Sequence, residues 1–209
     1  KYAGTIGDFG AYSFNGNKII TTGGGGAITA KEVRTVKHLR YLSTQCKDDP
    51  HYYIHNEVGY NYRMTNVQAA LGVAQLEELP EFIRRKQANY EMYKELFSGF
   101  ELGEMMDFRE GTSSNKWFYS LKIDKSRVKA TMREIITALE DLNVGTRAIW
   151  GLIHEQRPYL DDLAFEMEKA PYYSSCILNF PSSTNLNKED IEYTVEQIKK
   201  VLGDFANGK

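Results

Sequence analysis

The stretch SFNGNKIITTGGGG, residues 13–26, sets one lysine beside an apolar run and follows it with four consecutive glycines. Glycine gives up side-chain packing and costs backbone entropy, so four in a row need a reason in the path or the function of the chain. Lys18 lies between Asn17 and the apolar pair Ile19-Ile20. An apolar setting partly desolvates a lysine and lowers its pKa towards neutrality, which makes the amine a nucleophile for a carbonyl carbon.

A phosphate donor stands close to this lysine in the sequence. Ser13, five residues before Lys18, offers a hydroxyl and a nearby backbone N–H to an anion. Pyridoxal phosphate requires an amine that reacts with its aldehyde and hydrogen-bond donors that bind its phosphate. A nucleotide-binding loop does not fit, because here the lysine precedes the glycines and no G-x-G-x-x-G opens a helix. A solvated surface lysine is the simplest alternative.

The bulk properties bound the class of protein. The 209 residues are 42% hydrophobic, enough for one good core or two modest ones. A net charge of -2 without a strongly basic segment does not favour nucleic acid as a partner, and the apolar runs are far short of a membrane span. Cys46 and Cys176, 130 residues apart, favour reduced thiols in a cytoplasmic protein over a disulfide framework.

The first part of the chain predicts strands at 11–14 and 25–30, the latter buried and entered through glycine, with a further strand beginning at Lys18. A helix is expected from Lys31, and then a long loop over 45–63.

A second long helix is expected after Thr65, because Gln68 three residues later completes a capping box. Pro80 predicts that this helix kinks or restarts there before it ends near Gly99. We expect the domain junction near Pro80, which gives domains 1–80 and 81–209.

The remaining chain predicts a small α+β unit. Thr131 and Glu134 form a second capping box, and Asn187 is the expected cap of the last helix. The expected elements are strands at 115–123, 144–150 and 175–183, and helices at 131–143 and 187–202.

Four segments resemble one known family. The segment GDFGAYSFNGNKIITTGGGGAI (7–28) resembles the Schiff-base lysine region of the sugar-nucleotide aminotransferases of the DegT/DnrJ/EryC1/StrS family, pyridoxal-phosphate enzymes that aminate keto sugars. The segment GYNYRMTNVQAALGVAQLEEL (59–79) resembles the family's Gly-Tyr-Asn-x-Arg segment and its following helix. TRAIWGLIHEQRPY (146–159) and LNFPSSTNL (178–186) are similar to two later family elements. The likeness spans the whole chain.

The resemblance implies an aspartate-aminotransferase-like α/β fold (fold type I) and assigns roles to individual residues. Lys18 becomes the Schiff-base lysine and the group that moves the proton during transfer. Ser13 becomes a ligand of the cofactor phosphate. Asn61 becomes a phosphate ligand that reaches in from the other subunit of a homodimer, although a turn residue in a polar loop is its alternative. The role of Arg63 stays open.

Two more residues lie in the segment that the family uses near the sugar nucleotide. The resemblance makes His154 and Trp150 candidates for substrate contact, and a simple loop histidine is an equal alternative for His154. No metal is expected, since His51 and His55 have helical zinc spacing but PHYYIHNE lacks the HExxH character.

One departure from the family concerns the residues before Lys18. The family's acidic partner of the pyridine nitrogen, its stacking ring and a Gly-Thr/Ser phosphate contact precede the lysine by many residues, whereas only 17 residues precede Lys18 here. The chain also starts without a methionine, inside a strand-and-turn pattern. We therefore expect a C-terminal half, with 1–80 ending a large cofactor domain and 81–209 forming the small domain. Alone it is expected to be inactive.

The function that the resemblance implies is transamination of a nucleotide-linked keto sugar. The spelling SFNGNKIITT is most similar to members that act on UDP- or GDP-linked 4-keto-6-deoxyhexoses, with glutamate as amino donor, in surface glycan or amino-sugar biosynthesis. The alternative is a non-catalytic binding or regulatory module of the same fold. A sensor that lacks the lysine and a dehydratase with histidine in its place both disagree with Lys18.

Overall fold

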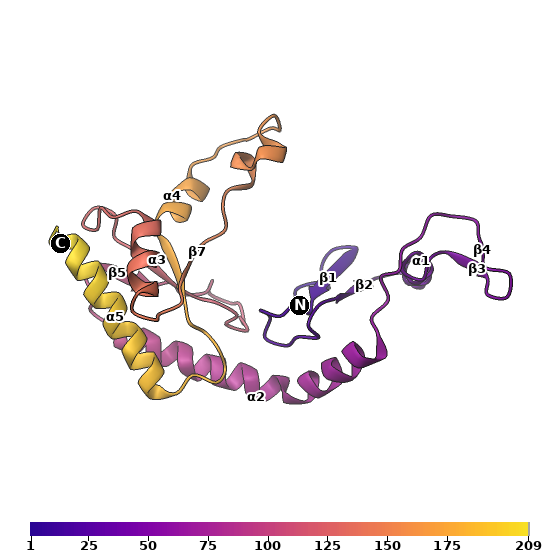
Figure 1. Cartoon of the computed structure of the whole chain (residues 1–209), viewed down its shortest axis with the longest axis horizontal. Helices are drawn as coiled ribbons and strands as arrows, with labels where there is room; N and C mark the ends of the chain where they lie inside the picture. Colours follow the sequence, from indigo (N-terminus) through magenta and orange to yellow (C-terminus); the bar gives the residue numbers. More distant parts are fainter. Residues whose placement is uncertain (209) are drawn as a thin grey trace. The chain divides into compact units, whose positions relative to one another are not determined.

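A computed structural model describes residues 1–208 and divides the chain into two compact units. Unit 1 is Lys1–Glu81 and unit 2 is Phe82–Lys209. One helix, α2 (Asn66–Leu96), contributes residues to both units. Figure 1 shows the order of the elements along the chain. Each unit is described by itself below.

Unit 1 opens with a hairpin. Strand β1 (Phe9–Ser13) pairs antiparallel with β2 (Gly26–Ala30), so Ser13 lies opposite Gly26. Both predicted strands are confirmed, but the expected burial of β2 is wrong, because its first four residues are exposed and no second layer of unit 1 covers them.

The strand expected at Lys18 is also absent from the structure. Residues 14–25 form a loop, in which the Lys18 backbone N–H donates to Asn15 O at 3.0 Å in a tight turn. A turn at this point directs the chain away from the extended geometry that pairing requires.

The middle of unit 1 holds α1 (Val33–Ser43) and a short hairpin of β3 (Lys47–Asp49) and β4 (Ile54–His55). The loop expected over 45–63 is therefore wrong in part. The Asp49 carboxylate accepts from the backbone N–H of His51 at 2.7 Å and of Tyr52 at 3.0 Å, which closes the turn between the two strands.

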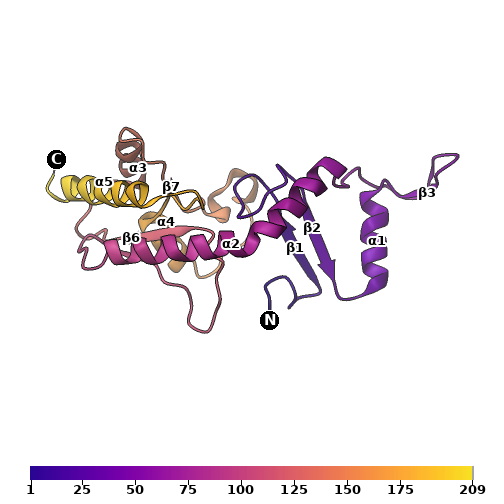
Figure 2. The same ribbon diagram turned by 90° about the horizontal axis from the view of Figure 1, so that it is seen from below.

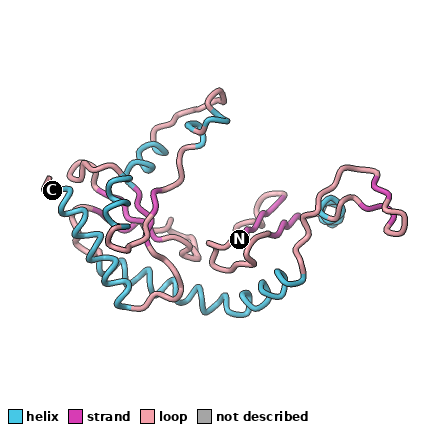
Figure 3. The backbone as a smooth tube through the Cα atoms, in the orientation of Figure 1, coloured by secondary structure: helices cyan, strands magenta, loops and turns pink. Residues whose placement is uncertain are grey.

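Helix α2 begins as the sequence predicts. The Gln68 N–H donates to Thr65 Oγ1 at 3.3 Å, and the Thr65 N–H donates to Gln68 Oε1 at 3.1 Å, which confirms the capping box. The helix remains continuous through Pro80 and does not restart there (Figure 3). It ends at Leu96, and Gly99 adopts a φ of 71° just beyond it, a conformation that favours glycine.

Unit 2 contains an antiparallel four-stranded sheet in the order β5-β6-β8-β7. Its buried side chains form one core with α2, α3 and α5, and α5 packs along α2 (Figure 2), where Lys199 Nζ donates to Leu96 O at 2.7 Å. The elements are β5 (Gly103–Met105), β6 (Tyr119–Ile123), α3 (Met132–Glu140), β7 (Arg147–Ala148), two 3-10 turns η1 (Ile153–Glu155) and η2 (Arg157–Tyr159), α4 (Lys169–Cys176), β8 (Ile177–Phe180) and α5 (Lys188–Ala206).

The capping boxes of unit 2 agree with the sequence. Thr131 pairs with Glu134 at the start of α3, and Asn187 pairs with Asp190 at the start of α5. The three predicted strands and two predicted helices form, with shorter strands than expected. Strand β5 and helix α4 were not predicted, because three residues of β5 and the weakly amphipathic α4 carry little periodic signal.

Candidate functional site

The loop that connects β1 and β2 carries the candidate lysine; residues 14–25 are called the Lys18 loop below. Backbone hydrogen bonds close it at its base, with Phe14 N–H donating to Gly25 O and Thr22 N–H donating to Phe14 O, both at 3.0 Å. The Thr21 hydroxyl also donates to Phe14 O at 3.0 Å. These bonds fix the two ends of the loop against each other.

Ser13 and Lys18 belong to the same hairpin in the structure. Lys18 is half-buried, whereas Ser13 is exposed at the end of β1. The Ser13 oxygen accepts from the Asn15 N–H at 3.4 Å, which leaves the hydroxyl hydrogen of Ser13 for donation to a ligand. This arrangement places an amine and a hydroxyl donor on one short segment.

The glycine run gives this hairpin its open side. Gly23 and Gly25 have φ angles of 76° and 83°, in the region that side chains rarely adopt. A Cβ at Gly23 or Gly24 would meet no atom within 4 Å, so the backbone there faces open space. The residues fit the aldehyde and phosphate ends of pyridoxal phosphate. The resemblance assigns no residue of this chain to the pyridine ring.

Asn61 lies in a different part of unit 1. It forms an antiparallel bridge with Thr44 at the end of α1, where the flanking Tyr60 and Tyr62 N–H groups donate to Leu42 O at 2.7 Å and Ser43 O at 3.1 Å. The rings of Tyr60 and Tyr62 stack at 4.9 Å, and Asn61 itself is exposed. The structure therefore holds Asn61 in an ordered, solvent-facing segment beside α1 and not in the Lys18 loop.

In unit 2, the predicted substrate residues follow β7. Trp150 is 64% exposed, and its ring contacts Trp117 at 6.2 Å and Phe118 at 5.5 Å between centroids. His154 lies in η1, half-buried, with its Nε2 3.9 Å from the Glu155 carboxylate. Trp150 thus belongs to an aromatic cluster (Trp117, Phe118 and Trp150), and no sequence motif pointed to its other two members.

Unit 2 also buries one lysine that sequence reasoning missed. Lys86 on α2 is 4% exposed, its ammonium donates to Ser182 O, and it lies 5.1 Å from the centre of the Tyr119 ring. The Tyr119 hydroxyl donates to the Lys86 carbonyl at 2.7 Å, and Ser182 Oγ donates to Trp117 O at 3.0 Å. Burial lowers the pKa of Lys86 to about 8.

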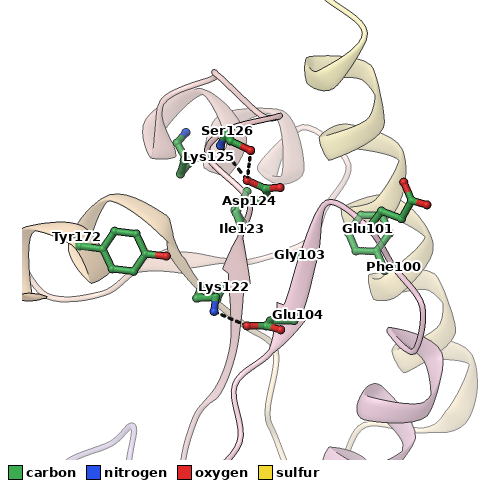
Figure 4. A pocket seen from close by; sticks show the side chains of 10 residues that line it. All are labelled: Phe100, Glu101, Gly103, Glu104, Lys122, Ile123, Asp124, Lys125, Ser126 and Tyr172. Carbon is green, nitrogen blue, oxygen red and sulfur yellow. Dashed lines mark hydrogen bonds and ion pairs between the residues drawn. The ribbon is translucent and has the colours of Figure 1, made fainter.

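A cavity of about 470 Å³ lies at the edge of the unit 2 sheet (Figure 4). Its charges are satisfied locally, because Lys122 pairs with Glu104 across β5 and β6 and Asp124 accepts from Ser126 N–H at 2.9 Å and Oγ at 2.6 Å. Tyr172 of α4 points into it from the opposite side. It contains none of the residues that the resemblance singles out.

Across residues 1–208, no three His, Cys, Asp or Glu side chains gather as metal ligands. His51 and His55 stand on a β-hairpin, and the His55 Nδ1 contacts Gln45 O at 2.7 Å. Both cysteines are buried free thiols. None of the helices in the described part of the chain combines the length and apolar character that crossing a bilayer requires.

Comparison with known proteins shows where this arrangement occurs. Over 165 residues, EpsN of Bacillus subtilis is 34% identical, which covers 79% of this chain and 42% of EpsN. GDP-perosamine synthase of Caulobacter vibrioides is 30% identical over 97% of this chain and 54% of its own length. The chain thus spans about half the length of the curated relatives it matches.

The structural neighbours confirm the predicted fold class. PseC of Helicobacter pylori, an aminotransferase of pseudoaminic acid biosynthesis, superposes with a TM-score of 0.90 at 19% identity, over 98% of this chain and 56% of PseC. The model of the DegT/DnrJ/EryC1/StrS aminotransferase family matches residues 1–199. Pyridoxal phosphate is the cofactor of that family. On this evidence, the chain belongs to the DegT/DnrJ/EryC1/StrS aminotransferase family.

Proposed function

We propose that this chain carries the lysine-bearing part of a sugar-nucleotide aminotransferase, which moves an amino group from glutamate to a nucleotide-linked keto sugar. The observation that carries this proposal is the half-buried Lys18 in a loop closed at its base, five residues after the hydroxyl of Ser13. Residues 1–80 form the end of the cofactor domain in this proposal, and 81–209 form the small domain.

The residues present define what the protein itself contributes. When bound, pyridoxal phosphate supplies the aldehyde that takes up the amino group and the ring that accepts an electron pair. Lys18 holds the cofactor through its amine and, once released, moves the proton at the reacting carbon as general base and then acid. Ser13 donates its hydroxyl hydrogen to the phosphate. These 209 residues do not complete the site by themselves, since the ring has no assigned partner among them.

The substrate is proposed from the relatives and from the aromatic cluster. GDP-perosamine synthases are among the relatives, and the sequence motif favours a UDP- or GDP-linked 4-keto-6-deoxyhexose. Trp150 exposes a ring face on which a base or sugar can stack, and His154 lies on the turn that follows. Two buried free thiols suit a reducing compartment, which supports a cytoplasmic reaction.

The first prediction concerns Lys18. We expect Lys18→Ala to abolish the borohydride-reducible attachment of pyridoxal phosphate in the holoenzyme, because no other amine stands in the same loop. Mass spectrometry of the reduced protein measures the adduct, and Lys37→Ala on the exposed side of α1 is the matched control. Equal labelling of the Lys18→Ala protein would refute the assignment, and absence of any adduct in wild type would favour the non-catalytic alternative.

The second prediction concerns Asn61, which we propose binds the cofactor phosphate of the partner subunit in a homodimer. A C2 interface is reciprocal, so each subunit gives one Asn61 and receives one. Loss of one hydrogen bond to a charged group costs about 1.5–3 kcal/mol, so Asn61→Ala should weaken cofactor affinity by about one to two powers of ten.

Mixed dimers separate the two possible positions of Asn61. In a dimer of Asn61→Ala and Lys18→Ala subunits, a crossed arrangement concentrates both lesions in one site and leaves the other intact. We expect activity to return on mixing. If heterodimers form without activity, each site carries one lesion and Asn61 acts within its own subunit.

A further inference from the structure

We infer that Gln75 and Gly72 of α2 are positioning residues for Lys18, because they hold the Lys18 loop at one place on the helix. The inference rests on the proposed function for the role of Lys18. Its structural part rests only on contacts within unit 1. Gly72 and Gln75 are spaced i, i+3 in the sequence, so they share one face of α2.

The polar contact runs from the loop backbone to the helix. The Thr21 N–H donates to Gln75 Oε1 at 3.2 Å. Thr21 also links the loop internally, since its hydroxyl donates to Phe14 O at 3.0 Å and accepts from the Gly23 N–H at 2.9 Å. One side-chain amide on α2 therefore anchors the residue on which the loop closes.

The second contact depends on the missing side chain of Gly72. A Cβ at Gly72 would lie 2.9 Å from the Thr22 methyl carbon Cγ2, so any side chain at this position would force Thr22 or the helix to shift. Thr22 is 5% exposed, and its N–H donates to Phe14 O at 3.0 Å. A shift of Thr22 would strain the hydrogen bond that closes the base of the loop.

The rest of the boundary between loop and helix is loosely filled. An apolar cavity of about 150 Å³ lies there, lined on the loop side by Phe14 and Ile20 and on the helix side by Val73 and Leu76. An unfilled apolar space forfeits dispersion contacts. The position of the loop on α2 therefore depends on the Gln75 hydrogen bond and the close contact at Gly72 more than on general packing.

The consequence for Lys18 follows from chain geometry. Lys18 precedes Thr21 by three residues, within a loop whose two ends meet at Phe14. Release of Thr21 from Gln75 frees the segment that carries the lysine. We expect the Lys18 amine to sample a wider range of positions once Thr21 is released.

Hydrogen exchange in the 209-residue chain tests the structural half. Gln75→Leu should speed exchange of the Thr21 amide about tenfold, the loss of one neutral hydrogen bond. Gln75→Glu keeps an acceptor oxygen and should restore protection. Glu78→Leu, an exposed site on the same helix, is the control and should leave the rate unchanged. An unchanged Thr21 rate in Gln75→Leu overturns the inference.

Absorbance of the Lys18-bound cofactor in the holoenzyme tests the functional half. The pH midpoint of its absorbance change should shift in Gln75→Leu and in Gly72→Ala, and it should stay near wild type in Gln75→Glu and Glu78→Leu. A midpoint that does not move in the first two variants overturns the positioning role. Failure of the Lys18→Ala adduct test would instead reject the proposed function and would leave the exchange result standing, so the two failures are distinguishable.

Discussion

The two units are stabilised by different kinds of interaction. Every member of the buried core belongs to unit 2, from Tyr90 on α2 to Leu202 on α5. Unit 1 buries Cys46 and Thr22, whereas large apolar residues of both its hairpin and its helices are exposed, including Phe9, Ile28 and Val67. Hydrogen bonds and close glycine contacts hold unit 1 together, and apolar burial holds unit 2.

This difference shows that an apolar residue pattern indicates a surface that favours burial, but it does not ensure that the same unit covers that surface. Ile28 stands in a strand that reads as buried, yet it is 56% exposed, because unit 1 offers no layer above that strand. Exposed apolar patches of this kind mark interaction surfaces in soluble proteins. The exposed faces of unit 1 accord with the homodimer proposed above, in which Asn61 crosses to the partner.

The largest expected effect comes from cutting into the unit 2 core. Leu178 is fully buried in β8, with β6 on one side and β7 on the other. Leu178→Ala should lower the free energy of unfolding by about 2–5 kcal/mol, from lost transfer energy and a residual cavity. Leu163→Ala, at a fully exposed site, should change it by less than about 0.5 kcal/mol. Urea denaturation measures both, and similar losses at the two sites would break the contrast.

A smaller effect concerns the buried charge of Lys86, whose pKa is lowered by burial to about 8. Between pH 8 and about 10.5 the unfolded chain keeps a proton that the folded chain has released, so stability rises with pH across that window. Below pH 8 the full cost of the buried charge is present. Relative to Lys86→Met, the wild type should therefore gain about 2–3 kcal/mol over this range.

The comparison with Lys86→Met removes other titrations from the result. Burial raises the pKa of Tyr93 to about 12 and also raises that of Tyr119, but both tyrosines are present in the two proteins. Unfolding free energies from urea titrations at pH 7.5, 9 and 10 give the difference. Parallel stability curves for the two proteins would show that Lys86 does not titrate in this window.

The smallest effect compares the two thiols. Cys46 in unit 1 and Cys176 in unit 2 are 0% and 1% exposed, and burial raises the pKa of both. Their reaction with a thiol reagent therefore reports local opening. We expect Cys46 to react about tenfold faster in the 209-residue chain, because less apolar burial opposes opening of unit 1. Cys46→Ser and Cys176→Ser assign the two phases. A faster Cys176 would reverse our ranking of the units.

Much of the local structure was determined by the sequence. The capping boxes at Thr65, Thr131 and Asn187 start helices where the sequence places them, since the side chain and the N–H groups it satisfies lie within four residues. The family motif around Lys18 identified the fold, and the residue patterns at 11–14 and 25–30 predicted the two strands that flank the Lys18 loop. Capping hydrogen bonds and sequence motifs can be predicted from neighbouring residues alone, because they do not depend on distant parts of the chain.

Only the tertiary structure shows which residues far apart in the sequence contact one another. The strand expected at Lys18 is a turn, because Phe14 pairs with Thr22 and Gly25 and closes a loop instead. The contact of Gln75 with Thr21 joins positions 54 residues apart, and buried Lys86 contacts Tyr119 of β6 and Ser182 of the loop after β8. No periodicity encodes such pairs, because their energies depend on which surfaces meet after the chain has folded.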